Sequence, residues 1–277
     1  MLDPYPLRLR GFNIPKPTHV SWNMNMFTMK NGLLDVQGYK VDFIDQTSLL
    51  TNESHDPSAS WASIVKLALS LELPYPNPDT TFERSSRIEV LWRTLTTNTY
   101  DKIYPAPSNI GALFIDYVLN LQIRHRLTPW SSSDEFQPHH SPVSNSIYPE
   151  WNSLLLLEHE DSLYSLKRYK ERLATVVEAM FNGTYSPIGL AQLQHEFDQG
   201  GGNRRRLFKT RMGYLGTGPR SLRKDDEIWV LSGGNAPFIL RRLPNGNYRL
   251  IGETFVYGIM QGEVHKLDLP QEQITIE

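Results

Sequence analysis

Near its start the chain alternates apolar and polar side chains as a half-buried β-strand does. The alternation runs over residues 18–26 and resumes over residues 34–45, on the two sides of Asn31-Gly32. This dipeptide readily adopts the positive φ angles of a tight two-residue turn. Period-two alternation places every second side chain on one face of a sheet. The sequence therefore predicts a β-hairpin over residues 18–45.

The middle of the chain changes to the spacing of amphipathic helices, in which apolar residues recur every three or four positions. Residues 74–79 read PYPNPD and are predicted as a loop, because each proline removes a backbone donor. Residues 128–150 are rich in serine and proline without periodicity, which predicts a long, mobile insertion. The predicted helices span residues 60–73, 82–99, 108–127, 160–182 and 187–198.

Beyond Gly200-Gly201-Gly202 the pattern returns to short β-type runs. Glycine-rich turns separate these runs, and Gly216–Pro219 is predicted as one of those turns. Short strands at regular spacing with such turns are typical of small antiparallel barrels. The runs are residues 204–210, 227–231, 238–243, 248–253 and 255–260. We therefore expect an α+β fold, with a mainly helical body and N-terminal β-hairpin over residues 1–199 and a small antiparallel β-barrel over residues 203–277.

Composition and charge narrow the function classes. The 277 residues carry 28 Lys and Arg against 30 Asp and Glu, a formal net charge of −2, which excludes a histone-like polycation. The chain has no cysteine, which excludes a disulfide framework, a Cys-ligated metal and a thiol nucleophile. Residues 1–10 contain two prolines and lack the apolar core of a signal peptide. We expect a cytoplasmic protein without membrane contact.

Several segments begin like catalytic or binding motifs but lack a required residue. Gly216–Pro219 lacks the Lys and Ser or Thr of a phosphate loop. His195-Glu196 begins like a zinc-protease helix, but Gln199 stands where the second His ligand is needed. The sequence thus predicts no catalytic, cofactor-binding or metal-binding residue, no small-molecule substrate and no enzyme. An unrecognised hydrolase or nucleotide-consuming enzyme stays open, because catalytic triads are recognised by geometry rather than by sequence position.

Positive charge is densest just after the glycine linker. Residues 203–277 carry 12 basic and 8 acidic side chains, whereas the rest of the chain has an acidic excess. The candidate interaction surface consists of Arg204, Arg205, Arg206, Lys209, Arg211, Arg220 and Arg223. One alternative is a nucleic-acid-binding barrel that uses the cluster at residues 204–211. Nucleic acid is not the expected partner, because domains that bind it usually have a pI above about 9.

An ordered series of short segments occupies the last third of the chain. It consists of Arg206–Thr210, Gly213–Pro219, Asp226–Leu231, Pro237–Arg241, Tyr248–Gly252 and Tyr257–Glu263. The series resembles the C-terminal region of fungal heterokaryon-incompatibility (HET-domain) proteins. Leu34–Ile44 is similar to a strand pair of that family, and Arg87–Leu95 resembles its W-R-T-L helix. The patterns of the N-terminal HET domain are not found, so we expect the chain to lack that domain.

The resemblance implies a non-enzymatic recognition or regulatory module. Its expected role lies in non-self recognition and in the regulation of programmed cell death, through protein–protein interaction. The implied partner is a protein, such as a full-length family member whose docking surface this chain would share.

Overall fold

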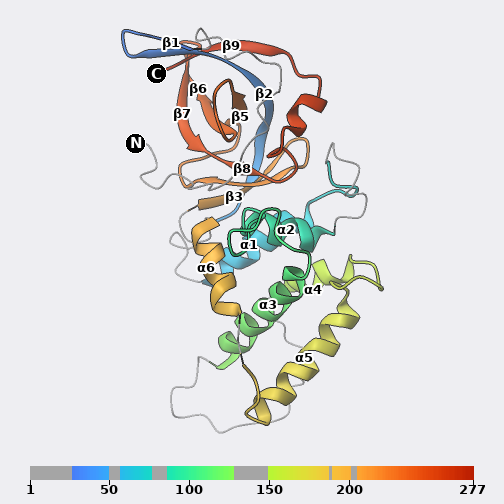
Figure 1. Cartoon of the computed structure of the whole chain (residues 1–277). Coiled ribbons are helices and arrows are strands. Elements are labelled where there is room, and N and C mark those ends of the chain that lie inside the picture. Colours follow the sequence, from blue (N-terminus) through green and yellow to red (C-terminus); the bar gives the residue numbers. More distant parts are fainter. Residues whose placement is uncertain (1–26, 50–56, 77–85, 128–148, 187–188, 201–204) are drawn as a thin grey trace.

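The computed structural model describes residues 27–49, 57–76, 86–127, 149–186, 189–200 and 205–277. Figure 1 shows the strands gathered at one end of the molecule and the helices at the other. The helices are α1 (Pro57–Leu69), α2 (Arg87–Leu95), α3 (Ile110–Leu127), α4 (Pro149–Leu156), α5 (Leu166–Phe181) and α6 (Leu190–Gly200). The strands are β1 (Phe27–Lys30), β2 (Leu33–Thr47), β3 (Arg205–Thr210), β4 (Leu215–Pro219), β5 (Glu227–Leu231), β6 (Phe238–Arg242), β7 (Tyr248–Glu253), β8 (Phe255–Val256) and β9 (Gln271–Ile276). The mixture confirms the α+β class.

The predicted hairpin is confirmed where the structure describes it. β1 and β2 pair antiparallel around Asn31-Gly32, whose φ angles are 53° and 78°. The predicted part before Phe27 lies outside the described residues. The strands are nevertheless unequal, because β2 has 15 residues and continues far beyond the end of β1.

β2 is the strand that joins the N-terminal part of the chain to the C-terminal sheet. The strand order is β5-β6-β7-β9-β2-β3-β4-β8, and β5 also pairs with β2. β2 thus contacts β9 over Leu34–Tyr39, β5 over Gly38–Phe43 and β3 over Ile44–Thr47. The sequence grouped this hairpin with the helical residues 1–199, whereas the structure places it in the sheet. Periodicity identifies a buried face but does not identify the strand that pairs with it.

β4 corrects the prediction of a turn at Gly216–Pro219. All five residues of β4 are buried, and the strand lies between β3 and β8. A Cβ at Gly216 would clash with the Phe208 ring and lie only 2.6 Å from the Phe255 carbonyl oxygen. The glycines are there because side chains from neighbouring strands cross close to the backbone, a role that glycine also fills inside strands.

The helices occur where apolar spacing predicted them, but their ends differ. α2 begins after Ser86, whose hydroxyl accepts a hydrogen bond from the Glu89 backbone N–H at 2.8 Å, so the helix starts later than the predicted residue 82. α5 likewise begins after the cap Ser165 rather than at residue 160. Residues 128–148 of the predicted insertion lie outside the described residues, and its last two residues begin α4, which the sequence did not predict. β9 was also missed, and β8 ends at Val256 rather than continuing as a strand to residue 260.

One apolar core continues from the helices into the sheet, and a second, smaller cluster surrounds Trp229. Trp92 and Trp151 are fully buried in the larger core. Trp61 is partly buried and packs against Trp151, with ring centroids 6.5 Å apart. The continuous core binds the helical part and the sheet into one packed structure.

Tyr75 fastens the loop after α1 to the sheet. Its buried hydroxyl donates to the Tyr257 carbonyl oxygen at 3.0 Å and accepts from the Leu215 backbone N–H at 2.7 Å. Its ring also meets Tyr214 edge-on, with centroids 6.1 Å apart. Burial raises the pKa of Tyr75 well above its usual value, so the hydroxyl keeps the proton that it donates.

Candidate interaction surface

The first basic residues of the predicted surface are used inside the fold. Arg205 is buried, and its Nη2 donates to the carbonyl oxygens of Thr217 and Glu253. Lys209 is half-buried, and its Nζ donates to the Ser70 carbonyl oxygen at 3.2 Å. Arg206 is also half-buried, and Arg204 lies outside the described residues. Arg205 and Lys209 therefore direct their charge towards backbone carbonyls rather than towards solvent.

Arg211 reaches the surface but has a partner there. Its Nη2 lies 2.7 Å from Asp225 Oδ1, and its guanidinium stacks 4.5 Å from the centre of the Phe43 ring. An exposed ion pair contributes only about 0–1 kcal/mol to stability, but it neutralises the local charge. Among the described residues of the cluster at 204–211, Arg205, Lys209 and Arg211 thus have partners within the fold.

Arg220 and Arg223, also predicted, lie exposed on the turn between β4 and β5. The fold brings Arg241 to this turn, because its Nη2 donates to the Ser221 carbonyl oxygen at 2.8 Å. Arg249 lies directly opposite Arg241 in the β6–β7 pair, so both side chains stand on the same face. We call Arg220, Arg223, Arg241 and Arg249 the arginine patch.

Asp226 holds the turn and β6 together beneath the patch. Its two oxygens accept from Arg241 Nε at 2.7 Å and Nη2 at 2.8 Å, and Oδ2 also accepts from the Arg223 backbone N–H at 2.7 Å. Asp226 is buried, and its hydrogen bond raises the pKa of Arg241. Bidentate pairs fix orientation as well as charge. The position of the turn on β6 is therefore set by this carboxylate.

Close backbone packing also fixes the turn against the β6–β7 hairpin. A Cβ at Gly218 would lie 2.6 Å from Ile239 Cδ1, and one at Gly252 would lie 2.7 Å from Pro219 Cγ. Both glycines let β4 approach the face that carries Arg241 and Arg249. The patch is thus assembled on a tightly packed part of the sheet.

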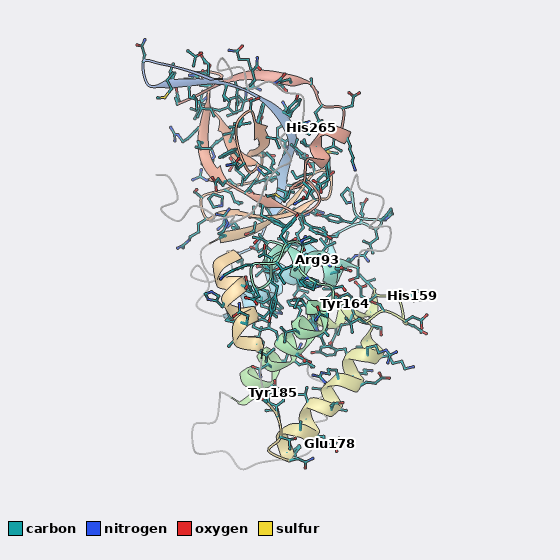
Figure 2. All side chains as sticks on the ribbon, viewed as in Figure 1. Arg93, His159, Tyr164, Glu178, Tyr185 and His265 are labelled. Carbon is teal, nitrogen blue, oxygen red and sulfur yellow. The ribbon has the colours of Figure 1, made fainter. Side chains whose placement is uncertain are left out.

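The W-R-T-L segment forms a buried polar network rather than an accessible site. Trp92 Nε1 donates to the Tyr164 hydroxyl at 2.9 Å. Arg93 donates from Nε to Glu89 Oε1 at 2.9 Å, and from Nη1 to Asn98 Oδ1 at 2.7 Å and to the Ala106 carbonyl oxygen at 2.9 Å. Figure 2 shows Arg93 in the helical part towards the sheet, with Tyr164 farther from the sheet. Burial raises the pKa of Tyr164, so its hydroxyl remains neutral.

Two shallow cavities of about 240 and 270 Å³ lie along α5 where it faces α3. Arg172 lines both cavities and forms a bidentate ion pair with Asp116, with distances of 2.6 and 2.7 Å. Tyr185 and Thr184 add hydroxyl groups to the smaller one, and Figure 2 places Tyr185 near the end farthest from the sheet. The guanidinium group that lines both cavities is therefore already paired with a carboxylate of the fold.

The residues that the structure describes contain neither a metal-binding cluster nor a membrane-spanning helix. Within that part of the chain, no three His, Asp or Glu side chains gather to hold a metal ion. No helix there combines the length and apolar character needed to cross a bilayer. Glu196, from the segment that begins like a zinc motif, accepts from the Asp101 backbone N–H at 3.0 Å and from Gln192 at 2.8 Å.

Comparison with known proteins identifies the class of the C-terminal region. Residues 177–273 match the Het-6 β-barrel domain, a match that contains all four arginines of the patch and begins within α5. Over 63 residues the chain is 38% identical to heterokaryon incompatibility protein 6, OR allele, of Neurospora crassa. This alignment covers 22% of the chain and 9% of that relative. No solved structure matches the chain. The resemblance to heterokaryon-incompatibility proteins is confirmed for this region.

Proposed function

We propose that this chain is a recognition or regulatory module of a fungal heterokaryon-incompatibility response. The observation that carries the proposal is the Het-6 β-barrel match over residues 177–273, together with similarity to a protein named for heterokaryon incompatibility. The module would act in the cytoplasm, in non-self recognition and the regulation of cell death. It would do so by binding another protein, such as a full-length relative whose docking surface it shares.

The strand pairing of the sheet supports the idea that the proposed protein-binding surface lies on a rigid scaffold. β2 pairs with β9 and β5, and β6 and β7 complete the circuit between them, so we infer a small closed barrel. Barrels remove sheet edges that would otherwise pair with other chains. A surface built on this scaffold is presented without large rearrangement, which favours recognition by preformed complementarity.

We infer a non-enzymatic role from the use of the buried charged groups. Arg93 is paired with Glu89, and Asp226 is paired with Arg241. Glu227 accepts from Trp229 Nε1 at 3.0 Å inside the sheet. The first pair lies within α2, the second joins the turn before β5 to β6, and the third lies within β5, so each buried charge has a partner inside the fold. Catalytic acids and bases instead need to reach the reacting group of a bound substrate.

The proposal is tested by expressing the full chain in a fungus beside full-length heterokaryon-incompatibility proteins. We expect altered growth or viability in at least one pairing, and co-purification of that relative with the chain. The same strains with an empty vector give the reference growth rate. Unchanged growth in every pairing, without a co-purifying relative, would contradict the proposed function.

A further inference from the structure

We propose that the arginine patch is a docking site for an acidic segment of a partner protein. This inference rests on the proposed function, and it names the surface and the chemistry of the partner. The three guanidinium groups of Arg220, Arg223 and Arg249 are exposed. Among the described residues, none of these three side chains forms an ion pair with a carboxylate. Their positive charge is therefore directed to solvent.

The surrounding basic residues differ from these three arginines. Arg241 is neutralised by Asp226, while Arg211 pairs with Asp225 at 2.7 Å. Lys224 lies within the same turn but points to Asp45, 3.4 Å away. On this face of the β6–β7 hairpin and the adjoining turn, the charge that no described carboxylate neutralises is that of Arg220, Arg223 and Arg249. A small, localised charge fits a short partner segment better than an extended polymer.

Carboxylate-bearing side chains are the ligands that this geometry favours. A guanidinium presents a planar fork that binds a carboxylate through two parallel hydrogen bonds. The Arg241–Asp226 pair displays this geometry beneath the patch. Because Asp226 fixes the turn to β6, the exposed arginines are carried by a braced backbone, which lowers the entropy cost of binding.

The charge of the whole chain favours an acidic protein segment over nucleic acid. The formal net charge is −2, and the acidic excess lies outside residues 203–277. Binding a long nucleic acid through many phosphates requires a larger basic surface than the few exposed arginines of the patch. A short run of Asp and Glu needs only the few charges that the patch provides.

The binding test uses the full chain and a fluorescein-labelled peptide in which Glu and Asp alternate with Ser and Gly. A labelled single-stranded oligonucleotide of equal charge serves as the competing probe. We expect anisotropy to show peptide binding at about 50 mM salt that weakens at about 300 mM, because salt screens exposed charges. The double variant R220E/R223E should lower peptide affinity at least about tenfold, since reversed charges repel the ligand.

Arg242→Glu is the matched control. Arg242 is exposed on the same hairpin, but it neighbours Arg241 in β6 and so stands on the opposite face. We expect R242E to change peptide affinity by less than about twofold, because alternate strand residues do not share a face. Circular dichroism and thermal unfolding of each variant establish that the fold is kept.

Three results would overturn the docking site. These are the absence of peptide binding at low salt, equal losses in R220E/R223E and R242E, and a patch-dependent preference for the oligonucleotide. A further result separates failure of this docking site from failure of the proposed function. If a heterokaryon-incompatibility relative co-purifies equally with the wild type and with folded R220E/R223E, the recognition role stands and the arginine patch does not carry it.

Discussion

A fragment of residues 177–277 will show no cooperative unfolding transition, although it contains the whole Het-6 β-barrel match. The fragment lacks β2, which pairs with β9, β5 and β3 in the full chain. Its loss uncovers the backbone groups of those strands and removes the buried Val36, Val41 and Ile44. Unpaired strand edges and exposed apolar faces do not support a stable sheet. Near-ultraviolet circular dichroism during heating measures this directly.

A rearranged fragment supplies the control for this prediction. Leu34 pairs with Ile276, so the start of β2 lies beside the end of β9. Residues 33–49 can therefore follow Glu277 through a short glycine–serine turn. We expect this fragment to regain a cooperative transition, because β2 can return to its place in the sheet. A cooperative transition in the fragment without β2 would contradict the prediction.

Replacing Arg93 by alanine will lower the free energy of unfolding by about 3–5 kcal/mol, the usual cost of breaking a buried ion pair from one side. The Arg93 side chain is only 7% exposed and pairs with Glu89 at 2.9 Å. Its removal also leaves Asn98 Oδ1 and the Ala106 carbonyl oxygen without this donor, and takes a cation from the face of Trp92. Urea denaturation of the full chain measures the difference.

Arg168→Ala is the matched control, because it removes the same side-chain charge from an exposed ion pair. Arg168 forms an ion pair with Glu171 on α5, but the two side chains are 60% and 51% exposed. We expect a loss of about 0–1 kcal/mol there, because water already solvates both groups. An Arg93→Ala loss no larger than that of Arg168→Ala would show that the buried network does not stabilise the helices.

Local sequence patterns predicted where helices and strands occur better than they predicted which strands pair in the sheet. Asn31-Gly32 marked the hairpin turn because its backbone preference is local. Apolar spacing likewise located α3 and α5, since each has a packed face. The pairing of β2 with β5 and β9 joins residues that are far apart in the chain, and no local signal specifies it. β4 was missed because glycine looks the same in a turn and in a strand crossed by neighbouring side chains.

Some residues of the candidate surface were predictable because charge density, like apolar spacing, is a local property of the sequence. Charge density identified Arg220 and Arg223, which lie exposed on a turn. It also selected Arg205, whose burial depends on the carbonyl oxygens that the fold places around it. Arg241 and Arg249 were missed, although Asn245-Gly246 between them is a hairpin signal. That turn fixes the register in which the two arginines face each other.

The folding of β2 with the C-terminal strands as one sheet underlies the display of the arginine patch. Native-state hydrogen exchange tests it most directly, because it reports the opening free energy of individual amides. The Ile44 N–H bonds to the Asp226 carbonyl oxygen at 2.9 Å, and the Tyr257 N–H to the Leu215 carbonyl oxygen at 3.0 Å. We predict that these two amides exchange with opening free energies within about 1 kcal/mol of each other, as members of one cooperative unit do. Fast exchange at Ile44 while Tyr257 stays protected would contradict the account.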